Sequence, residues 1–429
     1  MPEMKDSGIE WIGEIPKEWS ISKLKYELSE PMKYGASETG IDYDEKLYRY
    51  IRITDITTDG KLKDEGKLSL SESQAKGYIL KNDTVLFARS GGTVGKSFLY
   101  KKEYGKSAFA GYLISAVADN KKIYPKWLMY YTGSSSYKEW TNMIFNQATI
   151  QNIGADKYNN MQIPVAPLDE QNKIIDFLDS KCSEIDALTA DIQKEIEVLE
   201  EYKKSIITEA VTKGLEPNVE MKDSGIEWVG EIPSHWEIHP VYNFFGERKA
   251  KNYALKEQNL LSLSYGRIIR KDINTNGGLL PASFNTYNIV ESGDIIIRPT
   301  DLQNDKKSLR TGLVTEHGII TSAYIDLQPK NDVNSKYFHY LLHAYDVMKV
   351  FYNMGNGVRQ GLNYSEFSKL MVFAPPILEQ AHIADFLDNK CSEIDRAVAE
   401  KREQLTTLEE YKKSVIYEYV TGKKEVTAQ

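Results

Sequence analysis

A long internal repeat restricts the fold of this chain more than any other feature. The segment 4–21, MKDSGIEWIGEIPKEWSI, returns at 221–238 as MKDSGIEWVGEIPSHWEI, with 14 of the 18 positions identical. A second pair begins at Glu170 with EQNKIIDFLDSKCSEID and at Glu379 with EQAHIADFLDNKCSEID. The two offsets are 217 and 209 residues. Because long matched segments that recur at similar offsets mark repeated structural units, the chain is expected to hold two copies of one module.

The two divergent stretches between the matched segments, 22–166 and 239–375, are basic although the whole chain is acidic. They carry net charges of +5 and +4, against −8 for the chain, so the repeated frame holds the acidic excess. Lys and Arg neutralise phosphates, and this supplies the sequence-independent part of nucleic-acid binding. The pattern favours two different nucleic-acid readers on a common acidic frame, with ordinary surface charge as the alternative.

The repeated segments predict two long coiled-coil helices, because apolar residues recur at seven-residue intervals with Glu and Lys between them. The expected seam residues are Leu178, Ile185, Ile192, Leu199, Ile206, Leu387, Ile394, Leu408 and Val415. The positions expected beside the seam are Leu188, Ile196, Tyr202, Ala397, Leu405 and Tyr411. Lys401 interrupts the second seam, either as a register device or with only its stem along the edge.

The ends of these helices are also marked in the sequence. Pro167 and Pro375–Pro376 precede them, and Gly214 and Gly422 follow them as expected stops. A helix of about 40 residues is roughly 60 Å long. Two seams of matched length in one chain favour an intramolecular antiparallel pair that holds two domains at a fixed spacing. The alternative is that the helices dimerise the protein.

The composition is typical of a globular protein from a reducing cytoplasm. A chain of 429 residues exceeds one hydrophobic core, and 41% of its residues are apolar. The sequence has no run of 18 apolar residues, and its polar, acidic N-terminus does not resemble a signal peptide. Cys182 and Cys391 stand at equivalent repeat positions, and we expect both to be small buried residues.

Three local patterns suggest catalysis, and each lacks a required part. The segment Ser90–Ser97, SGGTVGKS, resembles a phosphate-binding loop, but Ser90 replaces the first glycine and strand-like sequence follows. His339 and His343 have the spacing of a metal-binding helix without its glutamate. Glu65 begins a Glu-Gly-Lys tripeptide of the kind found in nuclease sites, without a convincing upstream carboxylate. The sequence therefore predicts neither a catalytic site nor a metal site.

Polar, glycine-rich segments that follow strand-like runs are the expected ligand-contacting loops. Their side chains are of the kinds that read base edges and phosphates, and glycine permits close approach of the backbone. In the first divergent stretch the candidates are Arg52, Thr54, Arg89, Ser90, Gly91, Gly92, Thr93, Lys96, Asn146, Gln147, Thr149, Gln151 and Asn152. In the second they are Ser264, Tyr265, Arg267, Arg298, Thr300, Gln303, Asn304, Lys306, Lys307, Arg310, Asn356, Arg359, Gln360 and Asn363. The alternative is an ordinary solvent-facing role.

The EIPxxW motif, the P-L-x-E-Q-x-x-I-x-x-F/L-L-D segment and the LEEYKKS helix occur together, each in two copies. In this combination the chain resembles the specificity subunit of type I restriction–modification enzymes, over essentially its whole length. The second copy departs slightly from the first, since Pro375-Pro376-Ile377 stands where the first has Ala166-Pro167-Leu168. Base-contacting residues do not transfer with this resemblance, because recognition domains diverge with their targets.

The resemblance implies an α/β (α+β) protein with two mixed or mainly β target recognition domains, separated by a long antiparallel two-helix coiled coil. The implied divisions are a first recognition domain at 1–166, a first conserved helix at 167–214, a second recognition domain at 215–375 and a second conserved helix at 376–429. Each recognition domain would read half of a bipartite, asymmetric site in double-stranded DNA.

The resemblance also implies partners. Two modification (methyltransferase) subunits would dock on the helices and hold S-adenosylmethionine, and restriction subunits would hold ATP and Mg²⁺. This chain would itself be non-catalytic, cytoplasmic and free of cofactors. Two other functions stay open at this point. One is a scaffold that binds proteins through tyrosine-rich β domains, and the other is a nuclease using the Glu65 region.

Overall fold

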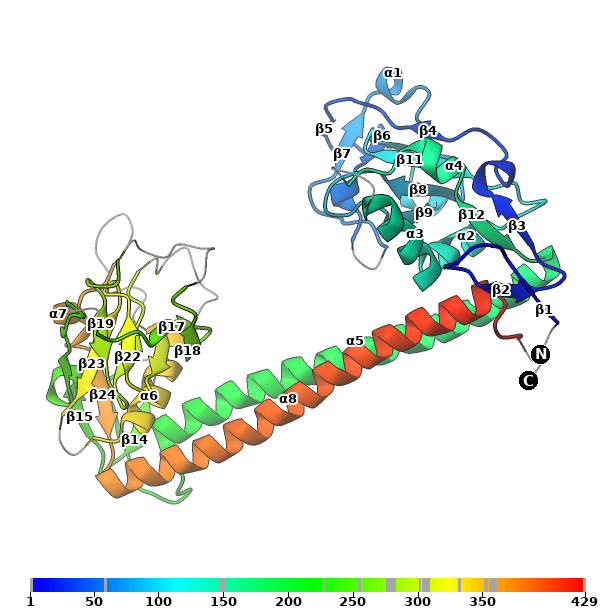
Figure 1. The fold of residues 1–429 in the computed structure, drawn as a ribbon. Helices are drawn as coiled ribbons and strands as arrows, with labels where there is room; N and C mark the ends of the chain where they lie inside the picture. The colour runs from blue at the N-terminus through cyan, green and yellow to red at the C-terminus, as the bar shows by residue number, and fades with distance from the viewer. Residues whose placement is uncertain are drawn as a thin grey trace. The chain divides into compact units, whose positions relative to one another are not determined.

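The chain folds as two compact units (Figure 1). Unit 1 comprises residues 1–192 and 403–429, and unit 2 comprises residues 193–402. The computed structural model describes residues 3–57, 60–146, 151–226, 229–253, 256–274, 283–300, 302, 309–330, 333–350, 354 and 361–426. Within these ranges, no helix combines the length and the apolar character needed to span a membrane.

Two long helices run through both units, α5 (Leu168–Lys213) and α8 (Ile377–Val420). In unit 1 the first part of α5 packs against the last part of α8, where Asp186 and Lys412 form an ion pair of 2.5 Å. In unit 2 the roles are reversed, and Lys203 pairs with Asp395 at 2.7 Å. The repeat supplies both pairs, with lysines from LEEYKKS and aspartates from SEID. The two helices pack together antiparallel, as the heptad pattern predicts.

Burial along these helices differs between the seam positions. Leu178, Ile185, Ile192, Leu387, Ile394 and Val415 are buried, whereas Leu199, Ile206 and Leu408 are partly exposed. Leu188 and Tyr202, expected beside the seam, are 48% and 54% exposed. A pair of helices covers only one stripe on each helix, so residues beside that stripe stay in solvent. Lys401 reaches Glu195 at 2.5 Å and ends in an ion pair at the edge of the seam.

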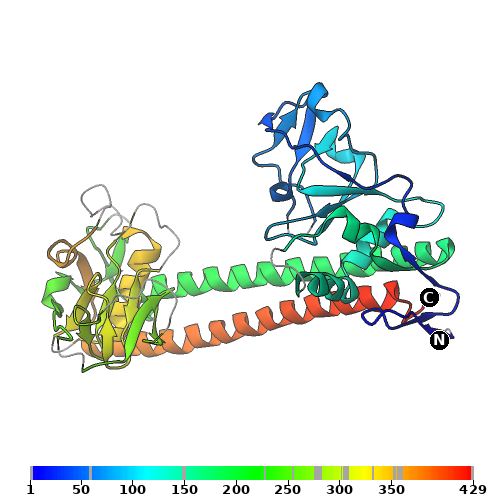
Figure 2. The ribbon, with the colours of Figure 1, turned by 45° about the horizontal axis from the view of Figure 1, so that its top comes forward.

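Unit 1 contains a mixed β domain. Its small sheets are β1 (Met4–Asp6) with β2 (Glu14–Pro16), and β3 (Ser20–Lys23) with β12 (Gln162–Val165). One larger sheet has the strand order β10 (Ser107–Phe109), β6 (Tyr48–Ile51), β7 (Leu68–Leu70), β5 (Ile41–Asp42). The other has the order β4 (Lys33–Tyr34), β11 (Leu113–Val117), β8 (Thr84–Ala88), β9 (Ser97–Tyr100). Its shorter helices are α1 (Glu72–Ala75), α2 (Pro125–Thr132), α3 (Ser135–Asn146) and α4 (Ala155–Asn159). Figure 2 shows α3 beside the C-terminal part of α8.

Unit 2 contains a second mixed β domain, and among the described strands three of its four sheets repeat the strand order of unit 1 while the fourth differs. Its small sheets are β13 (Met221–Asp223) with β14 (Glu231–Pro233), and β15 (Glu237–Pro240) with β24 (Met371–Ala374). One larger sheet has the strand order β16 (Phe245–Glu247), β23 (Ile325–Pro329), β20 (Ile295–Ile297), β21 (Thr311–Leu313). The other has the order β18 (Arg267–Lys271), β17 (Leu260–Ser264), β22 (Gly318–Ile320), β19 (Asn288–Val290). Its shorter helices are α6 (Ser335–Val347) and α7 (Tyr364–Phe367).

The repeated motifs join each β domain to a long helix in the same way. The buried Trp19 donates its indole N–H to Glu170 at 2.8 Å in unit 1. In unit 2, Trp236 makes the equivalent bond to Glu379 at 2.9 Å. The tryptophans come from EIPxxW and the glutamates from the Glu-Gln pair that opens each long helix. The duplicated sequence therefore encodes a duplicated joint between domain and helix.

The long helices end at the predicted glycines. Gly214 has φ +75° and Gly422 has φ +71°, in the left-handed region that glycine adopts without steric cost. A Cβ at Gly422 would collide with Pro16, and one at Gly214 would lie 3.4 Å from the Trp236 ring. Each glycine thus both ends a helix and permits close packing against an EIPxxW motif.

Candidate nucleic-acid interface

Three segments of unit 1 that lie far apart in the sequence meet around Arg89. The Arg89 amide donates to the Tyr112 carbonyl at 3.0 Å, and the Ile153 amide donates to the Arg89 carbonyl at 2.8 Å. Ser90 and Asn152 form an antiparallel bridge. The candidate loops at 89–96 and 151–152 therefore lie side by side. We call Tyr34, Arg89, Ser90, Tyr112 and Asn152 the Arg89 surface.

The Arg89 surface includes two tyrosines that the sequence analysis missed. Tyr34 lies under the Arg89 guanidinium, with 4.9 Å between the guanidinium carbon and the ring centroid. Its hydroxyl accepts a hydrogen bond from the Ala155 amide at 2.9 Å. Tyr112 is 64% exposed in the turn between β10 and β11. Neither tyrosine stands in a polar, glycine-rich cluster with arginine, so loop composition alone carried no signal for them.

The remaining described candidates on these loops are open to solvent. Thr93 is partly exposed, and Gly91, Gly92, Lys96 and Gln151 are exposed. A Cβ placed on Gly91 or Gly92 would have no atom within 4 Å. A phosphate or base could therefore approach this backbone closely.

Arg52 has a structural partner, in contrast to Arg89. Its guanidinium forms an ion pair with the buried Asp55 at 2.7 Å and donates to the Gly66 carbonyl at 2.8 Å. The hydrogen bond to Asp55 raises the pKa of Arg52. This arginine therefore connects Asp55 to the backbone at Gly66, whereas its neighbour Thr54 is exposed.

In unit 2 the candidate residues Ser264, Tyr265 and Arg267 belong to the β17–β18 hairpin. Tyr265 has φ +47° and Gly266 has φ +77°, the two left-handed residues of a type I′ turn. Tyr265 is 83% exposed at the tip. Arg267 pairs with Asp395 of α8 at 2.9 Å, and this contact ties the hairpin to the helix.

Arg310 was expected to contact a ligand, but it lies in the interior of unit 2. Its side chain is fully buried and donates to the Thr300 carbonyl, and its amide donates to Asp346. A buried guanidinium needs such acceptors, so Arg310 serves the packing of this region. Arg298 is partly exposed, and Thr300 is exposed.

Asn363 has a local structural role, because its side chain caps α7 by accepting from the Glu366 amide at 3.0 Å. Several other candidates lie outside the described residues. These are Gln147, Thr149, Gln303, Asn304, Lys306, Lys307, Asn356, Arg359 and Gln360, together with the side chain of Asn146.

The catalytic patterns weighed in the sequence take ordinary structural positions. The Ser90–Ser97 segment connects the antiparallel strands β8 and β9, whereas a phosphate-binding loop leads from a strand into a helix. His339 and His343 are partly buried in α6, and loss of solvation there lowers their pKa values to about 3 and about 4. Among the described residues, no group of three His, Cys, Asp or Glu side chains could hold a metal ion. Cys182 and Cys391 are buried thiols.

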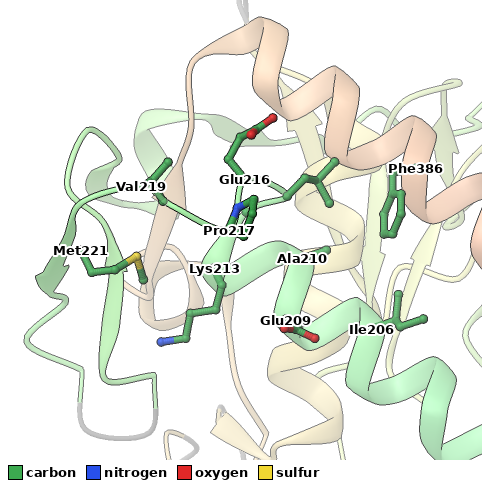
Figure 3. Close-up of a pocket in the computed structure, with 11 residues that line it drawn as sticks. Ile206, Glu209, Ala210, Lys213, Glu216, Pro217, Val219, Met221 and Phe386 are labelled. Carbon is green, nitrogen blue, oxygen red and sulfur yellow. The ribbon is translucent and has the colours of Figure 1, made fainter.

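A pocket of about 580 Å³ in unit 2 lies at the C-terminal end of α5 (Figure 3). Ile206, Ala210 and Phe386 line its apolar part. In unit 1 the equivalent of Ala210 is Tyr419, whose ring lies 4.4 Å from that of Phe177. The pocket exists because the repeat places a small residue in one copy and an aromatic residue in the other.

Comparisons with known proteins agree with this architecture. The family described as "Type I restriction modification DNA specificity domain" matches residues 16–198. The chain is 27% identical over 428 residues to a Methanocaldococcus jannaschii protein named as the MjaX type I restriction enzyme specificity subunit, covering 96% of this chain and 95% of that protein. It is 24% identical to the MjaVIII specificity subunit of the same organism, covering 95% and 93% of the two chains.

Solved structures show the same fold at low sequence identity. A chain from a study of complex assembly and conformational transition in the type I restriction–modification system superposes with a TM-score of 0.69 at 13% identity, covering 95% of this chain and 98% of that one. The HsdS subunit from Thermoanaerobacter tengcongensis gives a TM-score of 0.50 at 13% identity, with the same coverage. The duplicated frame, the matched family domain and the two full-length Methanocaldococcus jannaschii relatives identify the chain as a DNA specificity subunit of a type I restriction–modification system.

Proposed function

We propose that this subunit reads a bipartite, asymmetric DNA site, with one recognition domain for each half-site. The proposal rests on one contrast: both domains contact their helices through the same Trp–Glu hydrogen bond, but their exposed loops differ in sequence. Trp19–Glu170 and Trp236–Glu379 join the two domains to their helices in the same way. The β17–β18 hairpin of unit 2, with Tyr265 at its tip, is called the Tyr265 hairpin. It has no sequence in common with the Arg89 surface of unit 1. Two domains that are held alike but contact DNA with different side chains recognise two different sequences.

Within each half-site, phosphate contacts position the domain and a few base contacts specify the sequence. The net charges of +5 and +4 on the divergent stretches support the phosphate contacts, and the exposed Lys96 is one candidate. The Arg89 surface and the Tyr265 hairpin are the candidates for base contacts. The domain divisions expected from the sequence, 1–166 and 215–375, contain these two sites.

The long helices are the proposed docking surface for two modification subunits. Val198 and Tyr202 of α5 are exposed in unit 2, and Leu188 of α5 and Tyr411 of α8 are exposed in unit 1. Exposed apolar side chains on a helix mark a surface that a partner can bury. S-adenosylmethionine would then be bound by the modification subunits, and ATP and Mg²⁺ by restriction subunits, in the cytoplasm.

The test is sequence selection by the assembled complex. The full chain, combined with its modification subunits, is incubated with a random double-stranded DNA library, and the bound fraction is sequenced. We expect one motif with two specific, unequal halves separated by unspecified bases, and binding that weakens as salt concentration rises. Equal binding of all sequences, or a single uninterrupted motif, would contradict the proposal.

A further inference from the structure

Arg89 differs from the other arginines in the described part of the chain in the hydrogen bonding of its side chain. Among the described residues, none accepts a hydrogen bond from its side chain, and its Nε is buried without a partner. The other described arginines all have partners, among them Asp55 for Arg52, Asp294 for Arg248 and Asp395 for Arg267. A partly buried arginine with unused donors is prepared for a ligand that supplies the acceptors.

The position of Arg89 is determined by its surroundings rather than by an ion pair. Its amide and carbonyl are both bonded, to Tyr112 and Ile153, which restrains the backbone on either side of the side chain. The guanidinium carbon lies over the Tyr34 ring, and the hydroxyl of that ring accepts a hydrogen bond from the Ala155 amide. This cation–π contact restrains the guanidinium and leaves its charge available, so less conformational entropy remains to be lost on binding.

We infer that Arg89 reads a guanine in the half-site bound by unit 1, through two hydrogen bonds to O6 and N7 of the base. The inference rests on the proposed function and deepens it by naming the base. A planar pair of donors matches the two acceptors that guanine presents in the major groove, and the other bases do not present this pair. The neighbouring Gly91 and Gly92 leave open space around the site, so a DNA groove can approach.

A phosphate contact is the competing role for an unpaired arginine. The exposed Lys96 lies in the same loop and has the chemistry for that role, since an ammonium is a point charge without a planar fork. The two roles predict different results on substitution. Loss of a base contact relaxes the sequence preference at one position, whereas loss of a phosphate contact weakens binding to all sequences alike.

The experiment repeats the library selection with the full chain and its modification subunits, for wild type, Arg89→Ala, Arg89→Lys and the control Lys96→Ala. We expect both Arg89 variants to lower the preference for guanine at one position of one half-site by about 5- to 150-fold. The other half-site should be unchanged. Arg89→Lys keeps the charge and should retain more of the general affinity. Lys96→Ala should lower binding to all sequences and reduce its salt dependence.

A second pair of variants tests the stacking beneath Arg89. Tyr34→Phe keeps the aromatic face, whereas Tyr34→Leu removes it, and both lose the hydroxyl. We expect guanine preference to survive in Tyr34→Phe and to fall at the same position in Tyr34→Leu, with thermal melting used to compare folding. Uniform weakening by Arg89→Ala, or an unchanged motif, would overturn the guanine assignment while leaving the bipartite proposal standing. A change in both half-sites would overturn the assignment of one domain to each half-site as well. A wild-type complex without sequence preference would overturn both.

Discussion

At the scale of single residues, unit 2 contains a buried carboxyl group to which no described residue donates a hydrogen bond. Asp326 on β23 is 1% exposed, and neither of its side-chain oxygens has a partner in the described structure. Nearby, the buried Asp294 is paired with Arg248 at 2.7 Å. Burial, together with the charge of Asp294, raises the pKa of Asp326 to about 8. The protonated form of Asp326 is therefore the stable one in the folded domain at neutral pH.

This carboxyl group should make the stability of unit 2 depend on pH. Between the ordinary pKa of about 3.9 and the folded value of about 8, the folded state keeps a proton that the unfolded state releases. The contribution of Asp326 to the free energy of unfolding therefore falls as pH rises through this interval. We expect Asp326→Asn to raise stability at pH 9 by about 1–3 kcal/mol and to flatten the pH dependence.

Chemical denaturation of the full chain at several pH values between 5 and 9 measures this effect. Asp294→Asn is the control, because it removes a paired carboxylate and should lower stability across the range. Parallel pH curves for wild type and Asp326→Asn would show that Asp326 does not titrate in this interval.

At the scale of secondary-structure elements, the joint between domain and helix is the feature that the repeat conserves. A buried indole N–H that loses its acceptor costs about 1–3 kcal/mol, because its water contacts are not restored. Glu170→Ala leaves Trp19 without its acceptor, and Glu379→Ala does the same to Trp236. We expect each variant to destabilise its own unit by this amount.

Hydrogen exchange measured by mass spectrometry assigns each effect to a unit. We expect the loss of hydrogen-exchange protection to be greatest near residues 14–23 for Glu170→Ala and near residues 231–240 for Glu379→Ala. Asp169→Ala is the matched control, because its exposed side chain forms only a long contact of 3.9 Å to Lys173. Equal loss of protection in all three variants would mean that the Trp–Glu bond is not what stabilises the joint.

At the scale of the whole molecule, the two domains contact their long helices in the same way but carry different loops. This predicts that a recognition domain can be exchanged without disturbing the rest of the chain. Replacing residues 22–166 with the corresponding stretch of another specificity subunit keeps the EIPxxW motif and both long helices. We expect this exchange to change one half of the selected DNA motif and leave the other half as in wild type. The library selection measures both halves at once, and a change in both would refute the independence of the two domains.

The sequence by itself determined the duplicated architecture, the long helices and their glycine ends. These features depend on local patterns, namely a repeat, a seven-residue period and a residue free to adopt positive φ. Only the tertiary structure decided which polar residues are available to a ligand. Arg52, Arg89 and Arg310 stand in similar polar segments, yet Arg52 is paired with Asp55 and Arg310 is buried. Arg89 lies over the Tyr34 ring, and no described residue accepts a hydrogen bond from its side chain. The physical reason is that the surroundings of Arg89 and Arg310 are built from residues distant in sequence, which loop composition does not specify.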